Sequence, residues 1–186
     1  MQILEASQIE KDPYLKLMVY GQPGVGKTFL GLNTSLRVAY ICGEWEQARS
    51  TWQVLAERKV LHAGSKVFVV TSIQDMREAI KYLLDHPGEF DLVVLDNLTE
   101  IQEFIKVDLI DTEKKRDLNV LNIGEWQVLV DKTISVVKAC RDIPNTHFVC
   151  IAHFGETYDD RQQRFIRPSD RKSTRLNSSP ESPSRM

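Results

Sequence analysis

The chain has little cysteine, little net charge and no long apolar segment, and each shortage excludes a class of protein. Its three cysteines, Cys42, Cys140 and Cys150, are scattered and form no CxxC pair, which predicts buried, reduced thiols. No apolar run approaches the roughly 20 residues of a membrane-spanning helix. The N-terminus lacks the basic and apolar regions of a signal peptide. We therefore expect a cytoplasmic protein without a membrane partner.

The charge balance excludes a global positive field. The chain has 24 basic and 26 acidic residues, for a formal net charge of −2, so its overall charge does not attract nucleic acid. DNA binding by a local loop or by an assembled filament stays open. The 186 residues, 42% of them apolar, are enough for one α/β domain with a sizeable core.

The last residues differ in composition from the rest. From Asp170 onward the chain reads DRKSTRLNSSPESPSRM, which is rich in Ser, Pro and Arg and lacks apolar periodicity, as disordered segments do. The string DRKSTRLNSS also matches the translation of a common sequencing-library adapter. We therefore predict a domain over residues 1–169, interrupted near Ser169, and an artefactual tail over 170–186. A genuine flexible tail is the alternative.

Short apolar runs alternate with helical patterns along the remaining chain. The runs predict strands at 15–20, 37–42, 66–70, 91–95 and 147–152, and the periodic segments between them predict helices at 27–35, 44–59, 73–85, 98–110 and 124–142. Strands that are apolar on both faces indicate a mostly parallel sheet with helices on both sides, a three-layer α/β fold. Such folds bind ligands at the carboxyl ends of their strands.

A glycine-rich segment follows the first predicted strand. It fits the pattern G-x-x-x-x-G-K-[ST] in full, with Gly21, Gln22, Pro23, Gly24, Val25, Gly26, Lys27 and Thr28. Glycines let the backbone bend around a β-phosphate and direct N–H groups at it, and the following helix adds its N-terminus. Lys27 is expected to bridge the β- and γ-phosphates, and the Thr28 hydroxyl to ligate Mg²⁺. The segment predicts ATP and Mg²⁺ as cofactors.

Further polar residues follow three of the predicted strands. Asp96 ends the run FDLVVLD, where an aspartate can hold the Mg²⁺ shell. Thr99, which follows it, is expected to cap the next helix rather than to contact the nucleotide. Glu44 and Glu46 follow the second strand, and either can orient the water that attacks the γ-phosphate; from spacing alone the choice is open. His153 ends the run HFVCIA and can contact the γ-phosphate.

The order of these motifs resembles the RecA-like core of P-loop ATPases. RVAYICGE looks like the family's second strand and favours Glu44 over Glu46 as the catalytic glutamate, and His153 takes the place of the polar sensor. The combination of YGxPGVGKT, VLDNLTE, Trp126 and IAH resembles phage-encoded AAA/RecA-type nucleotide-binding proteins. Some of these act in single-strand annealing. The resemblance implies ATP hydrolysis in a bacterial host cell, with single-stranded DNA and further copies of the chain as partners.

DNA-binding loops of the RecA-like family match two segments of this sequence. These are 111–122, with Lys114, Lys115 and Arg116, and 154–168, with Arg161, Arg164 and Arg167. Any of the last three arginines could act as a finger on a neighbouring subunit. Solvated charged loops are the alternative for both segments. A nucleotide-driven loader or switch and a small-molecule kinase are the other functions that the phosphate loop allows.

Overall fold

The computed structural model describes residues 13–111, 123–158 and 164–168. The strands are β1 (Lys16–Gly21), β2 (Val38–Cys42), β3 (Lys66–Val69), β4 (Leu92–Asp96), β5 (His147–Tyr158) and β6 (Arg164–Pro168). The helices are α1 (Lys27–Leu32), α2 (Trp45–Glu57), α3 (Ile73–Asp85), α4 (Leu98–Asp111) and α5 (Ile123–Arg141). None of the helices in the described part of the chain is long and apolar enough to cross a membrane.

Five strands form a parallel sheet in the order β1-β5-β4-β2-β3, and β6 pairs antiparallel with β5. The strand β5, late in the sequence, therefore lies between β1 and β4. The register places His153 beside Gly21, and Cys42 beside Asp96. The residues predicted to bind phosphate and metal thus lie at the same end of the sheet, where β1, β2 and β4 finish.

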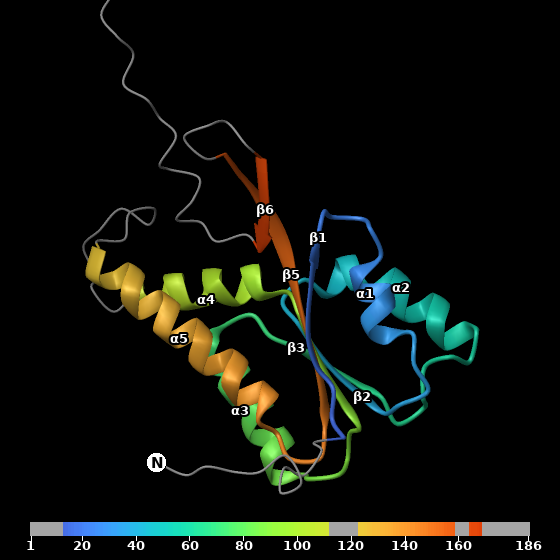
Figure 1. Ribbon diagram of the computed structural model, residues 1–186. Helices are drawn as coiled ribbons and strands as arrows, with labels where there is room; N and C mark the ends of the chain where they lie inside the picture. The colour runs from blue at the N-terminus through green and yellow to red at the C-terminus, as the bar shows by residue number, and fades with distance from the viewer. Residues whose placement is uncertain (1–12, 112–122, 159–163, 169–186) are drawn as a thin grey trace, which may run out of the picture.

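Helices cover both faces of this sheet (Figure 1), with α1 and α2 on one side and α3, α4 and α5 on the other. Alternate residues of each strand enter the two cores: Tyr40 and Val94 face α1 and α2, whereas Ile41 and Leu95 face the other three helices. Because both faces are covered, the central strands are apolar throughout. The predicted three-layer α/β fold is confirmed. All three cysteines are free and buried, as predicted.

The C-terminal part of the described chain differs from the prediction. The strand expected over 147–152 continues to Tyr158 and pairs with β6, so residues 154–158 and 164–168 form an antiparallel ladder where a loop was considered. The proposed finger residues Arg164 and Arg167 lie on β6, and Arg161 lies outside the described residues, as does the cluster Lys114–Arg116. The domain boundary at Ser169 also falls outside and stays a prediction.

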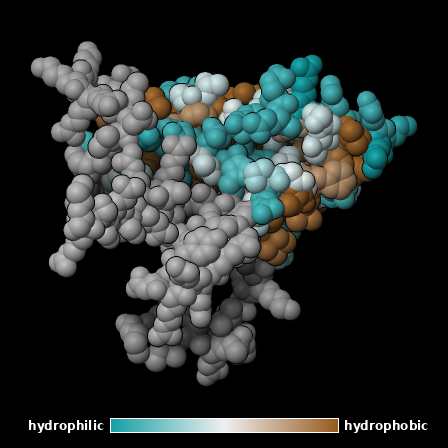
Figure 2. All heavy atoms as spheres, turned by 90° about the horizontal axis from the view of Figure 1, so that it is seen from above, coloured by the Kyte–Doolittle hydropathy of each residue, from teal (hydrophilic) through white to brown (hydrophobic). Residues whose placement is uncertain are grey.

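The strand that leads into the glycine-rich segment lies at the edge of the sheet. Within the described residues β1 pairs with β5 alone. Its side chains Leu17, Met18 and Tyr20 are nevertheless apolar and 43–48% exposed. Figure 2 views the molecule from the side where the strands end and shows apolar side chains reaching the surface among polar ones. Edge strands are usually more polar than this, so β1 has the composition of an interior strand.

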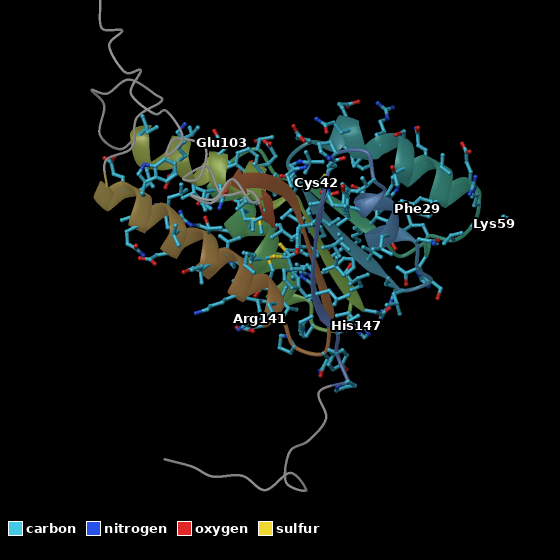
Figure 3. All side chains as sticks on the ribbon, turned by 45° about the horizontal axis from the view of Figure 1, so that its top comes forward. Phe29, Cys42, Lys59, Glu103, Arg141 and His147 are labelled. Carbon is cyan, nitrogen blue, oxygen red and sulfur yellow. The ribbon has the colours of Figure 1, made fainter. Side chains whose placement is uncertain are left out.

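At the end of the sheet where the strands begin, an ion pair joins two neighbouring strands. Arg37 donates to both carboxylate oxygens of Asp91 (2.9 Å from Nε to Oδ2, 2.6 Å from Nη2 to Oδ1), and its backbone N–H donates to Oδ2 as well. The pair joins the entries of β2 and β4. Hydrogen bonds from Arg37 hold the pKa of Asp91 at about 2. Figure 3 shows His147, at this end, far from Cys42 at the loop-bearing end.

We expect Asp91→Asn to lower the free energy of unfolding by about 1 kcal/mol at pH 7, a value discounted because both side chains are more than a third exposed. The folded-state pKa lies below the unfolded value of about 3.9, so this stabilisation is present above that value and is lost as the pH falls toward 2. Urea unfolding at pH 7 and pH 3 measures it. The difference from wild type should shrink at pH 3, and Asp85→Asn, at an exposed site, should show no such difference.

Candidate functional site

The glycine-rich segment forms a loop between β1 and α1 that only glycine accommodates at two points. Gly24 and Gly26 have φ angles of 80° and 89°, which are strained for residues with a Cβ atom. The loop returns so closely that a Cβ on Gly21 would lie 3.3 Å from Val25 Cγ2. The following helix α1 has only six residues, so the loop's own N–H groups matter more than a helix dipole.

Lys27 is placed inside the loop. Its side chain is buried, and Nζ donates to the carbonyl oxygens of Gly21 (2.9 Å) and Gln22 (2.8 Å). Burial lowers the pKa of Lys27, and the nearby Asp96 carboxylate opposes that shift. An ammonium held by neutral carbonyl groups keeps most of its charge for an anion, so Lys27 suits the phosphate-binding role expected of it.

Thr28 and Asp96 meet beneath the loop. The Thr28 hydroxyl donates to Asp96 Oδ2 at 2.6 Å, although the two residues are 68 positions apart. Hydroxyl and carboxylate oxygens are ligands that suit Mg²⁺, which takes one or two protein ligands, substrate phosphates and several waters. Among the described residues no group of three or more His, Cys, Asp or Glu could hold a metal. A metal bound with the help of phosphates therefore fits this pair.

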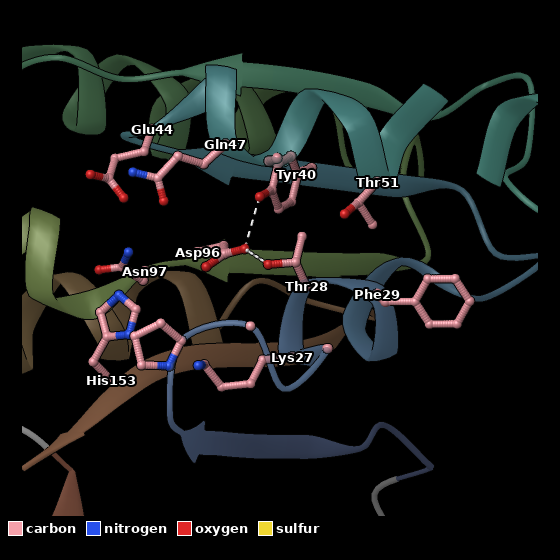
Figure 4. A pocket seen from close by; sticks show the side chains of 14 residues that line it. Lys27, Thr28, Phe29, Tyr40, Glu44, Gln47, Thr51, Asp96, Asn97 and His153 are labelled. Atoms are coloured by element: carbon pink, nitrogen blue, oxygen red, sulfur yellow. Dashed lines mark hydrogen bonds between the residues drawn. The ribbon is translucent and has the colours of Figure 1, made fainter. Parts of the chain in front are cut away.

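Tyr40 was not among the residues that the sequence singled out. It lies on β2, is 1% exposed, and its hydroxyl donates to the same Asp96 oxygen at 2.8 Å. Figure 4 shows both hydroxyls converging on Asp96. Burial, reinforced by the charge of Asp96, raises the pKa of Tyr40, so the phenol keeps its proton and donates. The one signal in the sequence is a tyrosine within an otherwise aliphatic strand.

The two candidate glutamates have different surroundings. Glu44 is the N-cap of α2 and lines the pocket above the loop, together with Gln47 (Figure 4). Glu46 is 80% exposed and lies 3.6 Å from Arg49 on the helix surface. The structure thus brings Glu44 into the pocket and leaves Glu46 out.

His153 lies on β5 at the near wall of the pocket, close to Asn97 (Figure 4). Its Nδ1 is buried and has no hydrogen-bond partner in the described part of the protein. The ring lines the pocket, whereas this nitrogen is not exposed to solvent. Thr99 was expected to cap the next helix. Instead the side chain of Asn97 accepts from the Glu100 N–H at 3.0 Å and caps α4.

The pocket brings together most of the predicted site residues and several that were not predicted, but Gly21, Gln22 and Val25 do not line it. Its lining residues come from the loop, α1, β2, the first turns of α2, the end of β4 and the middle of β5: Pro23, Gly24, Gly26, Lys27, Thr28, Phe29, Tyr40, Glu44, Gln47, Ala48, Thr51, Asp96, Asn97 and His153. The unpredicted members lie on helix faces or inside a strand, where sequence periodicity describes packing rather than ligand contact.

Comparison with protein families agrees with this geometry. The family model of the AAA domain matches residues 14–179. The chain belongs to this family. The match supports nucleotide binding and ATPase activity in general, and no significant match exists among curated proteins. The matched residues include the glycine-rich loop, Asp96 and His153.

A pair of glycines allows the loop's backbone to be tested separately from its stability. Gly26 has a φ angle of 89° and Gly88 has one of 80°, and both have open space where a Cβ would lie. Each Ala variant should lose roughly 1–2 kcal/mol of stability. Only Gly26→Ala should also weaken nucleotide binding, roughly tenfold or more, because it displaces N–H donors to a charged group, worth about 1.5–3 kcal/mol each. Calorimetry and thermal melting measure the two effects; equal loss of binding in both variants would contradict the loop assignment.

Proposed function

We propose that this AAA domain binds ATP with Mg²⁺ and hydrolyses it. The observation that carries the proposal is the contact of Thr28, on the loop, with Asp96, on β4, at 2.6 Å. It supports a metal site between the loop and the sheet, where Thr28 and Asp96 would hold Mg²⁺ and the ion, when bound, would neutralise the charge of the phosphates. The loop's N–H groups and Lys27 would hold the phosphates themselves.

The remaining pocket residues supply the parts that hydrolysis needs. Glu44 is the carboxylate that orients the attacking water and accepts its proton. His153 lines the same pocket from β5 and is the candidate contact to the γ-phosphate. Its paired neighbour across the ladder is Gly21, the first residue of the loop. Loss of the γ-phosphate would therefore remove a contact at His153 and alter the surroundings of β5.

Glu44→Gln should preserve ATP binding and slow turnover by about a hundredfold or more, because the amide cannot accept a proton. Single-turnover hydrolysis and equilibrium binding of ATP separate the two effects. Glu46→Gln is the matched control, since its side chain lies on the surface of the same helical turn. The reverse pattern, slow turnover in Glu46→Gln alone, would move the role to Glu46.

We further propose that the ATPase acts in DNA recombination or single-strand annealing, as a phage-encoded protein that assembles on single strands. The support is the RecA-like order of motifs and a fold in which β5 extends beyond His153 into the ladder with β6. The basic residues of 154–168 follow the γ-phosphate contact directly along the chain. ATP binding can thus be linked to Arg164 and Arg167 through β5 and its ladder with β6.

Turnover of ATP by the full-length protein should rise several-fold when single-stranded DNA is added, and Lys27→Ala should abolish turnover in both conditions. Steady-state phosphate release with and without a homopolymeric oligonucleotide measures this. If DNA neither binds to the protein nor stimulates its ATP turnover, the DNA proposal is refuted and the ATPase proposal stands. Turnover by Lys27→Ala at the wild-type rate would refute the ATP site itself.

A nucleotide-dependent loader or switch for a replication protein is the second candidate. It uses the same ATP site, with ATP binding ordering a surface for a protein partner and hydrolysis being slow. The exposed apolar side chains of β1, with Val25 and Leu30 at 61% and 65% exposure beside it, favour a protein contact. Turnover that depends on a protein partner but not on DNA would support this function.

A further inference from the structure

The phenol of Tyr40 lies between the metal-binding carboxylate and the helix that carries Glu44. Its hydroxyl donates to Asp96 Oδ2 at 2.8 Å, and its ring packs on Trp52 of α2 with centroids 6.0 Å apart. Trp52 in turn meets Trp45, the first residue of α2, edge to face at 6.1 Å. Tyr40 therefore contacts both the sheet side and the helix side of the pocket.

The two hydroxyls divide the Asp96 carboxylate into two unlike oxygens. Oδ2 accepts from Thr28 and from Tyr40. Oδ1 accepts no hydrogen bond from the residues that the structure describes, so it is the oxygen available to a hydrated cation. A carboxylate with two donors on one oxygen has its rotamer and its orientation defined. Loss of either donor removes part of that definition.

We infer that Tyr40 is a positioning residue for the Mg²⁺ site, which orients Asp96 toward the hydrated metal and couples that orientation to α2. The inference rests on the proposed ATP–Mg²⁺ site and deepens it. Tyr40 touches neither the phosphates nor the metal in this arrangement and acts through Asp96. Its partner hydroxyl on Thr28 is expected to ligate the metal directly, so the two donors to Oδ2 differ in role.

The test compares Tyr40→Phe with the wild-type chain over a range of Mg²⁺ concentrations. The variant keeps the aromatic ring and its packing on Trp52 but lacks the donor. We expect the Mg²⁺ concentration for half-maximal ATP turnover to rise about tenfold or more, the usual effect of removing a partner of a metal ligand. ATP binding in EDTA should stay within about twofold of wild type, because the loop and Lys27 are unchanged.

Tyr82→Phe is the matched control, since this hydroxyl also lies near a carboxylate, 3.3 Å from Glu89 Oε1, but outside the pocket. Its Mg²⁺ dependence should equal that of wild type. An unchanged Mg²⁺ dependence in Tyr40→Phe would overturn the inference. Equal loss of ATP binding with and without Mg²⁺ would overturn it too, because it would mark a structural role. A wild-type chain that binds no ATP would refute the proposed function, and this inference with it.

A measurement on the chain with Tyr40 intact does not depend on how the variant folds. Adding Mg²⁺ to the ATP-saturated protein should change tryptophan emission, since Trp52 packs on Tyr40. Trp52→Phe should remove most of this change, and Trp126→Phe, on α5 in the other layer, should retain it. A change that survives Trp52→Phe and disappears in Trp126→Phe, or no change at all, would contradict the coupling.

Discussion

Asp96 Oδ2 accepts hydrogen bonds from Thr28 and Tyr40, which lie on two different elements far from Asp96 in the sequence. Thr28 lies in the first turn of α1, Tyr40 lies on β2, and Asp96 ends β4. The carboxylate is placed at the centre of the sheet, with β2 on one side of it and β5 on the other. The loop, the first turn of α2 and the end of β5 surround it, so the composition of the pocket depends on where this one group lies.

The sheet order explains why these elements meet. Because β5 lies between β1 and β4, the loop and Asp96 are two strand positions apart, which leaves space for phosphates above β5. The parallel arrangement places all strand ends at one edge, and the Arg37–Asp91 pair fixes β2 against β4 at the other. The pocket and the Arg37–Asp91 ion pair thus lie at opposite ends of the same strands.

Much of the fold could be predicted from the sequence, and the reasons are local. The helix α3 has the predicted bounds because Ser72 caps it, accepting from the Asp75 N–H at 3.1 Å, and Pro87 and Gly88 follow its end. The loop was recognisable because its glycines, lysine and threonine fall at fixed spacing within residues 21–28. Asp96 and His153 were found because apolar strands ended in polar residues.

The features that were missed depend on tertiary structure. Tyr40 reads in the sequence as one more core residue, since its hydroxyl partner is 56 positions away. Asn97 rather than Thr99 caps α4, a choice between neighbours that only backbone geometry decides. The pairing of β5 with β6 was missed because residues 154–168 are polar and lack clear alternation. Strand order likewise cannot be read from strand positions along the chain.

The pairing of Gly21 with His153 has a mechanical consequence. Both residues belong to one ladder of backbone hydrogen bonds between β1 and β5, and such a ladder resists sliding of one strand along the other. The start of the loop and the histidine therefore move as a single rigid body. Glu44 lies two residues beyond the end of β2, and β2 is joined to that ladder through β4. The backbone of one continuous sheet therefore fixes the spacing between the start of the loop, His153 and the strand that precedes Glu44.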